Sequence, residues 1–236
     1  MIPSLLIIFL FIGHSNMTGY CAAMDTVTNQ HVYSYDVKRG FYNCTDRDLG
    51  GGSGSPVMPF LKRMSTMYPG YNFCGIRFAG PCRQAFHVYS EQRHREAIHN
   101  IVSQVKDKGM FGGVLLMFGV IENQYDGVDS LELSLIKLVA FLRAETGVKL
   151  PVILGRFEEN GDKIQGAPMF KHEKQTVKII NGMPQLIENL SLTPFKPVPK
   201  SDFCDNHHYD SNGYKIWSHD AATIYKYNGY DEWSRP

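Results

Sequence analysis

The feature that most constrains this chain is an apolar run near its start that leads directly into a short polar segment. Residues 5–12 are eight consecutive apolar residues, and residues 13–17 read Gly-His-Ser-Asn-Met. A run of this length between Pro3 and Gly13 is typical of a strand that is buried on both faces of a sheet. Ligands of open α/β sheets bind beyond the carboxyl ends of the strands. The position of Ser15 therefore predicts a hydroxyl group beside a binding cleft.

The same stretch has three interpretations that the local sequence does not separate. It can be a secretory signal peptide, an ordinary buried strand followed by an unrelated serine, or a strand that carries a nucleophile. The length of the apolar core and the small residues Ala22 and Ala23 suit a signal peptide, whereas the absence of Lys or Arg before Lys38 does not. The rest of the chain has to decide between them.

Composition narrows the class of protein. The 236 residues are 43% hydrophobic and 12% aromatic, which is typical of a globular protein large enough for one α/β domain. The 24 Lys and Arg residues nearly balance the 23 Asp and Glu residues, so the net charge of +1 does not favour nucleic acid or an acidic membrane surface as a partner. Beyond residues 5–12, no apolar run approaches the roughly 20 residues of a membrane-spanning helix.

The cysteines leave the redox compartment open. There are five, namely Cys21, Cys44, Cys74, Cys82 and Cys204. The number is odd and no Cys-x-x-Cys pair occurs, so we expect no zinc ribbon, whereas one or two disulfides remain open for an exported protein.

Apolar periodicity alternates between the strand and helix patterns along the chain. The expected strands cover residues 5–12, 72–79, 113–118 and 151–154, with an edge strand over 192–198. The expected helices cover residues 58–67, 91–108, 129–146, 175–190 and 212–227, and residues 20–56 are expected to form a long loop. This alternation predicts an α/β fold in which a parallel sheet is covered by helices on both faces and the first four strands end at one edge.

The residues beyond those strand ends include the parts that acyl transfer by a serine requires. Ser15 supplies a hydroxyl, and His208 supplies an imidazole, the side chain best suited to take a proton near neutral pH. Asp205, three residues earlier, can orient that imidazole. Charge that develops on the substrate oxygen needs hydrogen-bond donors, which the N–H groups of Ser15 and Gly80 and the side-chain amide of Asn123 can supply.

Four short blocks, taken in order, resemble the hallmark residues of the SGNH (GDSL-like) hydrolase superfamily. They are Ser15, Gly80, Asn123 and the Asp-Asn-His-His segment 205–208. Residues 13–17 are similar to the Gly-Gln-Ser-Asn-Met block of its sialate O-acetylesterase and acetylxylan esterase group. Residues 55–60 resemble the Gly-Pro-x-x-Pro-Phe segment of that group, and residues 208–214 resemble its terminal His-Phe/Tyr and Gly-Tyr pairs. The resemblance covers nearly the whole chain.

This resemblance implies a fold and an activity. The implied fold is a single domain over residues 1–236, a three-layer α/β/α sandwich with a central parallel sheet and flavodoxin-like topology. The implied protein is a serine esterase that removes O-acetyl groups from a carbohydrate, with Ser15 as nucleophile, His208 as base and Asp205 orienting that base. Ser15, Gly80 and Asn123 would form the oxyanion site. The implied partner is an acetylated carbohydrate, and neither a cofactor nor a metal is expected.

Three further residues are candidates for contact with the substrate, and two blocks depart from the group's pattern. The candidates are His14, Glu122 and Arg156, although Glu122 also suits a buried hydrogen-bond network and Arg156 suits a surface ion pair. His14 replaces the usual Gln of the first block. The third block, residues 119–123, lacks the Gln of the usual Gln-Gly-Glu-Ser-Asp/Asn, and Pro81 replaces a glycine in the second.

The signal-peptide interpretation fails if Ser15 is the nucleophile, because cleavage near Ala23 would remove Ser15 and its strand. The group is commonly secreted, so we expect a secreted or periplasmic protein whose signal peptide is absent from this sequence. Neither a membrane nor nucleic acid is an expected partner, and the sequence does not determine the oligomeric state.

Alternatives to this function remain at this point. A lipid, aryl or thioester hydrolase would be favoured by an apolar groove near Phe86 and Met110, whereas tyrosines of the 20–56 loop would favour a sugar by stacking. A carbohydrate-binding protein without activity is a third hypothesis. The acidic and histidine residues of the last block could form a metal cluster, but no helix-spaced histidine pair is present.

Overall fold

The computed structural model describes residues 5–19, 25–49, 54–80, 84–119, 122, 127–156, 172–193 and 208–234. The strands are β1 (Leu6–Gly13), β2 (Val32–Asp36), β3 (Gly40–Asn43), β4 (Asn72–Ala79), β5 (Met110–Met117), β6 (Val152–Leu154) and β7 (Leu190–Leu192). The helices are α1 (Ser15–Thr18), α2 (Val57–Met67), α3 (Ala85–Ser90), α4 (Gln92–Val105), α6 (Val128–Thr146), α7 (Glu173–Leu186) and α8 (Ser211–Tyr227), with a 3-10 helix η3 (Glu232–Ser234) near the C-terminus.

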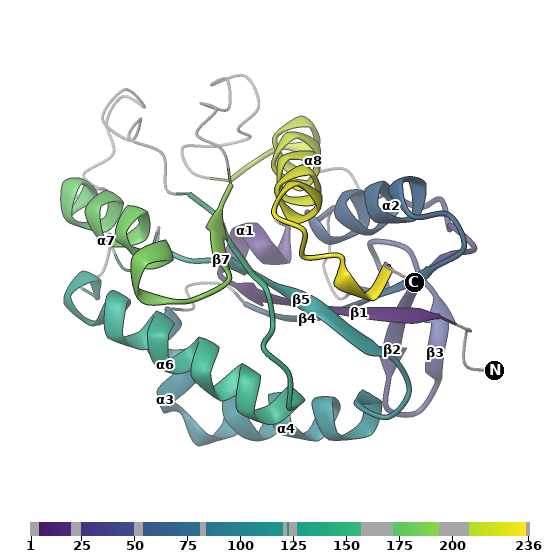
Figure 1. Ribbon diagram of the computed structural model, residues 1–236, viewed down its shortest axis with the longest axis horizontal. Coiled ribbons are helices and arrows are strands. Elements are labelled where there is room, and N and C mark those ends of the chain that lie inside the picture. Colours follow the sequence, from purple (N-terminus) through teal and green to yellow (C-terminus); the bar gives the residue numbers. More distant parts are fainter. Residues whose placement is uncertain are drawn as a thin grey trace.

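The strands form one sheet in the order β3-β2-β4-β1-β5-β6-β7. Every neighbouring pair is parallel except β2 and β3. Figure 1 shows α2 and α8 on one side of this sheet and α3, α4 and α6 on the other, and each side has its own apolar core. The three-layer α/β/α architecture predicted from the alternation of patterns is confirmed.

β1 lies at the centre of the sheet because both of its faces are apolar. Ile7, Phe9 and Phe11 pack on the side of α2 and α8. Ile8 and Leu10 pack on the side of α4 and α6. All eight residues of β1 are buried, and full burial of one such side chain stabilises the fold by about 1.5–3 kcal/mol. An uninterrupted apolar run is therefore what this position requires.

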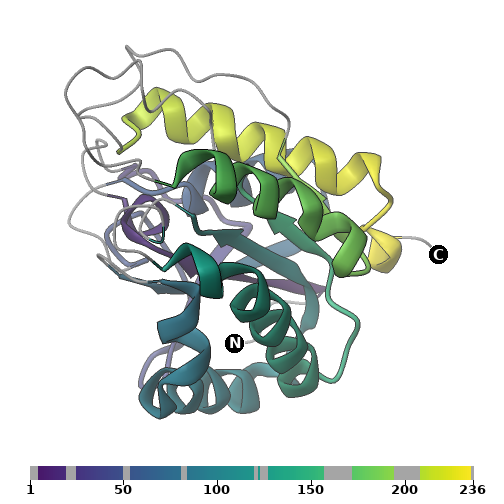
Figure 2. The same cartoon turned by 90° about the vertical axis from the view of Figure 1, so that its left-hand side faces the viewer.

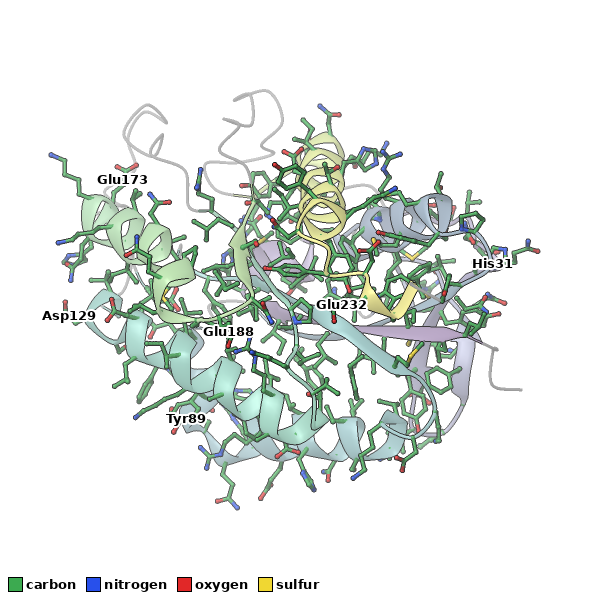
Figure 3. The ribbon with its side chains drawn as sticks, viewed as in Figure 1. His31, Tyr89, Asp129, Glu173, Glu188 and Glu232 are labelled. Carbon is green, nitrogen blue, oxygen red and sulfur yellow. The ribbon has the colours of Figure 1, made fainter. Side chains whose placement is uncertain are left out.

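The carboxyl ends of the parallel strands meet at one edge, as the sequence pattern predicted. Gly13, the last residue of β1, pairs with Ala79 of β4 and with Met117 of β5. Helices α6 and α7 begin at the same edge with Asp129 and Glu173 in their first turns, where negative charge is favourable (Figure 3). This edge is where the candidate site residues gather.

The prediction of a long loop over residues 20–56 is wrong in part, because this segment contains the antiparallel hairpin of β2 and β3. The side chain of Asp36 accepts the N–H groups of Lys38 and Arg39, and Gly40 adopts a φ of 72° that closes the turn. Strands this short, at the edge of a sheet, have too little apolar periodicity to stand out from a polar loop.

Three other bounds differ from expectation. β5 begins at Met110 rather than at residue 113, because Gly112 is a strand residue and not part of a turn. A Cβ on Gly112 would lie 2.7 Å from side-chain atoms of Ile7 and Phe9, so glycine here admits the large side chains of β1. A separate helix, α3, precedes α4, and β7 begins at Leu190, where a helix was expected. The edge strand expected over residues 192–198 overlaps β7 only at Leu192, and residues 194–198 lie outside the described part of the chain.

Aromatic side chains near the C-terminus pack at the edge of the sheet opposite to the candidate site. The indole N–H of Trp233 donates to the Tyr225 hydroxyl at 2.8 Å, and that hydroxyl donates to the Gly112 carbonyl at 2.6 Å. The Tyr68 hydroxyl donates to Asp231 at 2.8 Å. These contacts close the apolar core beneath α2 and α8.

Two of the five cysteines are described. Cys44 and Cys74 are buried and form no disulfide, whereas Cys21, Cys82 and Cys204 lie outside the described residues. Within the described ranges, no helix is long and apolar enough to cross a membrane.

Candidate active site

The candidate site begins at the turn between β1 and α1. His14 is the N-cap residue of α1, and its Nδ1 accepts the N–H of Asn16 at 3.2 Å. Ser15 is the first residue of α1 and is 6% exposed. At the other end of this short helix, the guanidinium of Arg77 on β4 donates to the carbonyl of Thr18. Burial lowers the pKa of Arg77 to about 10.

The structure brings Ser15 and His208 together. The Oγ atom of Ser15 and the Nε2 atom of His208 lie 2.8 Å apart, although 193 residues separate them in sequence. His208 is 6% exposed and precedes α8. Asp210 caps α8 by accepting the N–H groups of Asn212 at 2.8 Å and Gly213 at 2.9 Å. Figure 2 shows α8 from the side, with its first turn at the same end of the molecule as α1.

Three hydroxyl groups anchor α8 at successive points along its buried face. The Tyr214 hydroxyl donates to Oδ1 of Asn16 at 3.3 Å, and the Ser218 hydroxyl donates to the Pro56 carbonyl at 2.7 Å. Further along the helix, Tyr225 reaches the main chain of β5. α8 therefore has a defined position over the sheet. Tyr209, which precedes the N-cap residue of α8, lies against Asn16 of α1.

The candidate oxyanion donors are only partly described. Ser15 contributes the first N–H of α1. The N–H of Gly80, which we expected to face a substrate oxygen, instead donates to the carbonyl of Gly13 at 3.3 Å and extends the pairing of β1 with β4. Asn123 lies outside the described residues, as do Asp205 and His207.

Glu122 binds main-chain groups rather than facing the cleft. Its carboxylate is 1% exposed, with one oxygen accepting the N–H of Ala85 at 2.7 Å and the other accepting the N–H of Gly119 at 2.9 Å. Burial raises the pKa of the carboxyl, and the two N–H donors oppose that shift. Glu122 thus joins the start of α3 to the segment that follows β5. These contacts favour a role in a buried hydrogen-bond network over a contact with the substrate.

His14 and Arg156 differ in their surroundings. The ring of His14 is completely buried, so it supports the turn before Ser15 rather than meeting a substrate. Arg156 follows β6 at the same edge, and its main-chain N–H donates to the Thr193 hydroxyl at 2.9 Å. The Nε atom of Arg156 is buried and makes no hydrogen bond within the described part of the chain.

Sequence reasoning missed Asn16 and Tyr214 as members of the site. Both lie inside blocks that carried the resemblance, since Asn16 follows Ser15 and Tyr214 belongs to the Gly-Tyr pair. No spacing rule connects two residues that lie 198 positions apart. Only their place in those blocks could have drawn attention to them.

A serine just beyond the central strand, hydrogen-bonded to a histidine that precedes the last helix, places a hydroxyl and an imidazole together at the carboxyl edge of a mostly parallel α/β sheet. No family model and no curated protein matches the chain in sequence. Its structure is similar to that of a protein from Arabidopsis thaliana, with a TM-score of 0.71 and 14% identity over 94% of this chain and 98% of that one. The chain has the fold of the SGNH (GDSL-like) hydrolases.

Two further solved structures share this fold. One is the acetylxylan esterase Axe2 from Geobacillus stearothermophilus, with a TM-score of 0.58 and 17% identity over 97% of this chain and 96% of that one. The other is a lipase/acylhydrolase from Enterococcus faecalis, with a TM-score of 0.58 and 14% identity over 94% of this chain and 96% of that one. At these identities the likeness concerns the fold.

Proposed function

We propose that this protein is a serine ester hydrolase that removes O-acetyl groups from a carbohydrate. The observation that carries the proposal is the 2.8 Å separation of Ser15 Oγ and His208 Nε2, a distance at which the imidazole can take the hydroxyl proton. Both side chains are almost fully buried at the carboxyl edge of the sheet, where open α/β proteins bind their ligands.

The chemistry proceeds in two stages through an acyl-enzyme. His208 takes the proton of Ser15 as Oγ attacks the acetyl carbonyl, and the resulting imidazolium then protonates the departing sugar oxygen, which leaves as a hydroxyl group. Water, deprotonated by the same imidazole, releases acetate and restores the serine. This sequence needs the proton of neutral His208 on Nδ1, and we assign Asp205 to accept from that atom. No cofactor takes part.

The oxyanion of each tetrahedral intermediate needs donors that are already in place. We assign the Ser15 N–H and the side-chain amide of Asn123 to this role. Gly80 is omitted because its N–H is engaged with Gly13. Glu122 contributes indirectly, since it bonds the main chain at Gly119, four residues before Asn123.

The choice of an acetylated sugar rests on the motif resemblance and on the acetylxylan esterase among the structures that share the fold. Phe86 and Met110, the two residues expected near an apolar groove for a lipid substrate, lie far apart. Phe86 is on α3, which follows β4 at the site edge, whereas Met110 pairs with Ile7 at the start of β1. Gly13 lies six positions after Ile7 along β1, which is about 20 Å along a strand.

The tyrosines expected to stack on a sugar, Tyr33, Tyr35 and Tyr42, contact other parts of the protein. Tyr33 packs against the apolar core on the side of α4 and α6. Tyr35 packs against Phe41 and its hydroxyl donates to Gln104 of α4 at 3.0 Å, and Tyr42 lies beneath the guanidinium of Arg39. Both belong to the hairpin at the far edge of the sheet. The proposal therefore names the acetyl ester as substrate and assigns no stacking residue.

The test compares acyl donors on the wild type, on Ser15→Ala and on a matched control. We expect release of acetate from acetylated xylo-oligosaccharides or O-acetylated sialic acid, and faster hydrolysis of p-nitrophenyl acetate than of the hexanoyl and octanoyl esters. Ser15→Ala should abolish all of it, whereas Ser103→Ala, at an exposed position of α4, should not. A rate maximum at six to eight carbons with no acetate from either sugar would replace the sugar esterase by a lipid esterase.

A further inference from the structure

Asn16 lies between the two halves of the candidate site. Its side-chain Oδ1 accepts the main-chain N–H of Tyr209 at 3.1 Å and the hydroxyl of Tyr214 at 3.3 Å. Its own N–H donates to His14 at 3.2 Å, and the residue is only 3% exposed. Asn16 therefore contacts the turn before α1 through its main chain, and it contacts the residue after His208 and the first turn of α8 through its carboxamide.

The hydrogen bond from Tyr209 runs beside the bond between Ser15 and His208. Ser15 and Asn16 are consecutive, and so are His208 and Tyr209, so the two chain segments are joined at two neighbouring points. One bond involves the imidazole ring, which has to move a proton during the reaction. The other involves main chain, which stays in place when the imidazole becomes charged.

The Tyr214 hydroxyl is a second donor to the carboxamide of Asn16. The rings of Tyr209 and Tyr214 pack edge to face at a centroid distance of 5.7 Å, so the segment that enters α8 is braced by packing as well as by hydrogen bonds. Both donors reach the same oxygen of Asn16. That oxygen connects α1 to the segment that leads into α8 and to α8 itself.

We propose that Asn16 is a positioning residue that acts through His208 by holding the main chain at Tyr209, so that Nε2 stays within reach of Ser15 Oγ. This role rests on the proposed function, because it gives Asn16 no contact with the substrate. The role needs an acceptor at this position, which an oxygen of either a carboxamide or a carboxylate supplies. The inference predicts that loss of the oxygen slows the chemical step and leaves substrate binding unchanged.

The experiment measures kcat and KM with p-nitrophenyl acetate for the wild type, Ser15→Ala, Asn16→Leu and Asn16→Asp. Leu has nearly the shape of Asn without its acceptor, and Asp keeps an oxygen that both donors can reach. We expect kcat of Asn16→Leu to fall about 100-fold, the loss that a misplacement of about 1 Å can produce, with KM changed less than about twofold. Asn16→Asp should retain at least about a tenth of the wild-type kcat.

Asn43→Ala is the matched control for loss of stability. The side chain of Asn43 donates to two main-chain carbonyls, those of Asn29 and Val32, in the region of the β2–β3 hairpin. Like Asn16→Leu, this variant removes side-chain hydrogen bonds to the main chain, but it lies away from α1 and α8. It should lower the melting temperature and keep the wild-type kcat. An equal loss of kcat in Asn16→Leu and Asn43→Ala would overturn the role of Asn16.

Tyr214→Phe keeps the test decisive if Asn16→Leu does not fold. It removes one hydroxyl and should lower kcat about 2- to 10-fold at constant KM, the worth of one hydrogen bond. A change in melting temperature alone would overturn the inference, as would an Asn16→Asp variant as slow as Asn16→Leu. If the wild type shows no Ser15-dependent hydrolysis, the proposed function fails and this role fails with it. Hydrolysis by the wild type with undiminished kcat in Asn16→Leu would overturn the role alone.

Discussion

The main chain of Gly13 lies against the carbonyl oxygen of Met117, closer than any side chain would allow. A Cβ on Gly13 would lie 2.5 Å from that oxygen, which also accepts the N–H of His14 at 3.2 Å. β1 and β5 therefore remain paired up to the residue before Ser15. The glycine is needed for this close approach, and the pairing it permits fixes where the main chain delivers Ser15.

Gly13→Ala should lower both stability and activity. The added methyl group must push β1 away from β5, and strain of this kind costs about 1–3 kcal/mol. Because Ser15 follows two residues later, kcat should fall as well. Thermal unfolding and p-nitrophenyl acetate kinetics measure the two effects. Gly182→Ala in α7, where a Cβ would meet nothing within 4 Å, should instead be neutral or slightly stabilising. Equal behaviour of the two variants would refute the argument.

Glu122→Gln should destabilise the protein and slow it. The two carboxylate oxygens accept two different N–H groups, and a glutamine turns an NH2 group towards one of them. A buried donor left without an acceptor costs about 1–3 kcal/mol. Circular dichroism melts and initial rates provide the comparison, with Glu132→Gln at an exposed position of α6 as control. A melting temperature equal to that of the wild type would show that the network is not required.

Asp46 should make the protein less stable as the pH rises through the weakly acidic range. Burial raises the pKa of its carboxyl to about 6, although N–H groups of Asp25 and Ser55 donate to it. The carboxyl of an aspartate in the unfolded chain has a pKa of about 4. Between these values the folded state binds more protons than the unfolded state, so the free energy of unfolding falls with increasing pH.

Asp46→Asn provides the comparison for this pH dependence. Between about pH 4 and pH 6.5, the free energy of unfolding of the wild type should fall relative to that of the variant by on the order of 2 kcal/mol. Urea titrations at several pH values measure it. Parallel curves for the two proteins would show that Asp46 is not the group responsible.

Asn123→Ala should lower kcat by about 10²–10³-fold, the loss seen when one oxyanion donor is removed. KM should change little, because the donor acts mainly on charge that forms in the transition state. Steady-state kinetics of the acetyl ester are sufficient, with Asn100→Ala at an exposed position of α4 as control. If Asn123→Ala is silent, the donor is another group of the segment that follows β5.

The sequence by itself determined the central strand, the alternation of strands and helices and the edge at which the site lies. These follow from local patterns, because a strand buried on both faces needs an unbroken apolar run and parallel strands need helical crossovers. The blocks around Ser15 and His208 also identified which residues to examine. The hairpin of β2 and β3 was missed because its strands are short and because they depend on pairing, β3 with β2 and β2 with β4.

Tertiary structure alone decided what each candidate side chain touches. Gly80 has the right residue type and position for an oxyanion donor, yet its N–H is taken by Gly13. The side chains of His14 and Glu122 are buried inside the protein. The contact of Asn16 with α8 follows only from the packing of α8 against α1. The physical reason is that hydrogen-bond partners far apart in sequence are set by the packing of whole elements, whereas local patterns record only which face of an element is apolar.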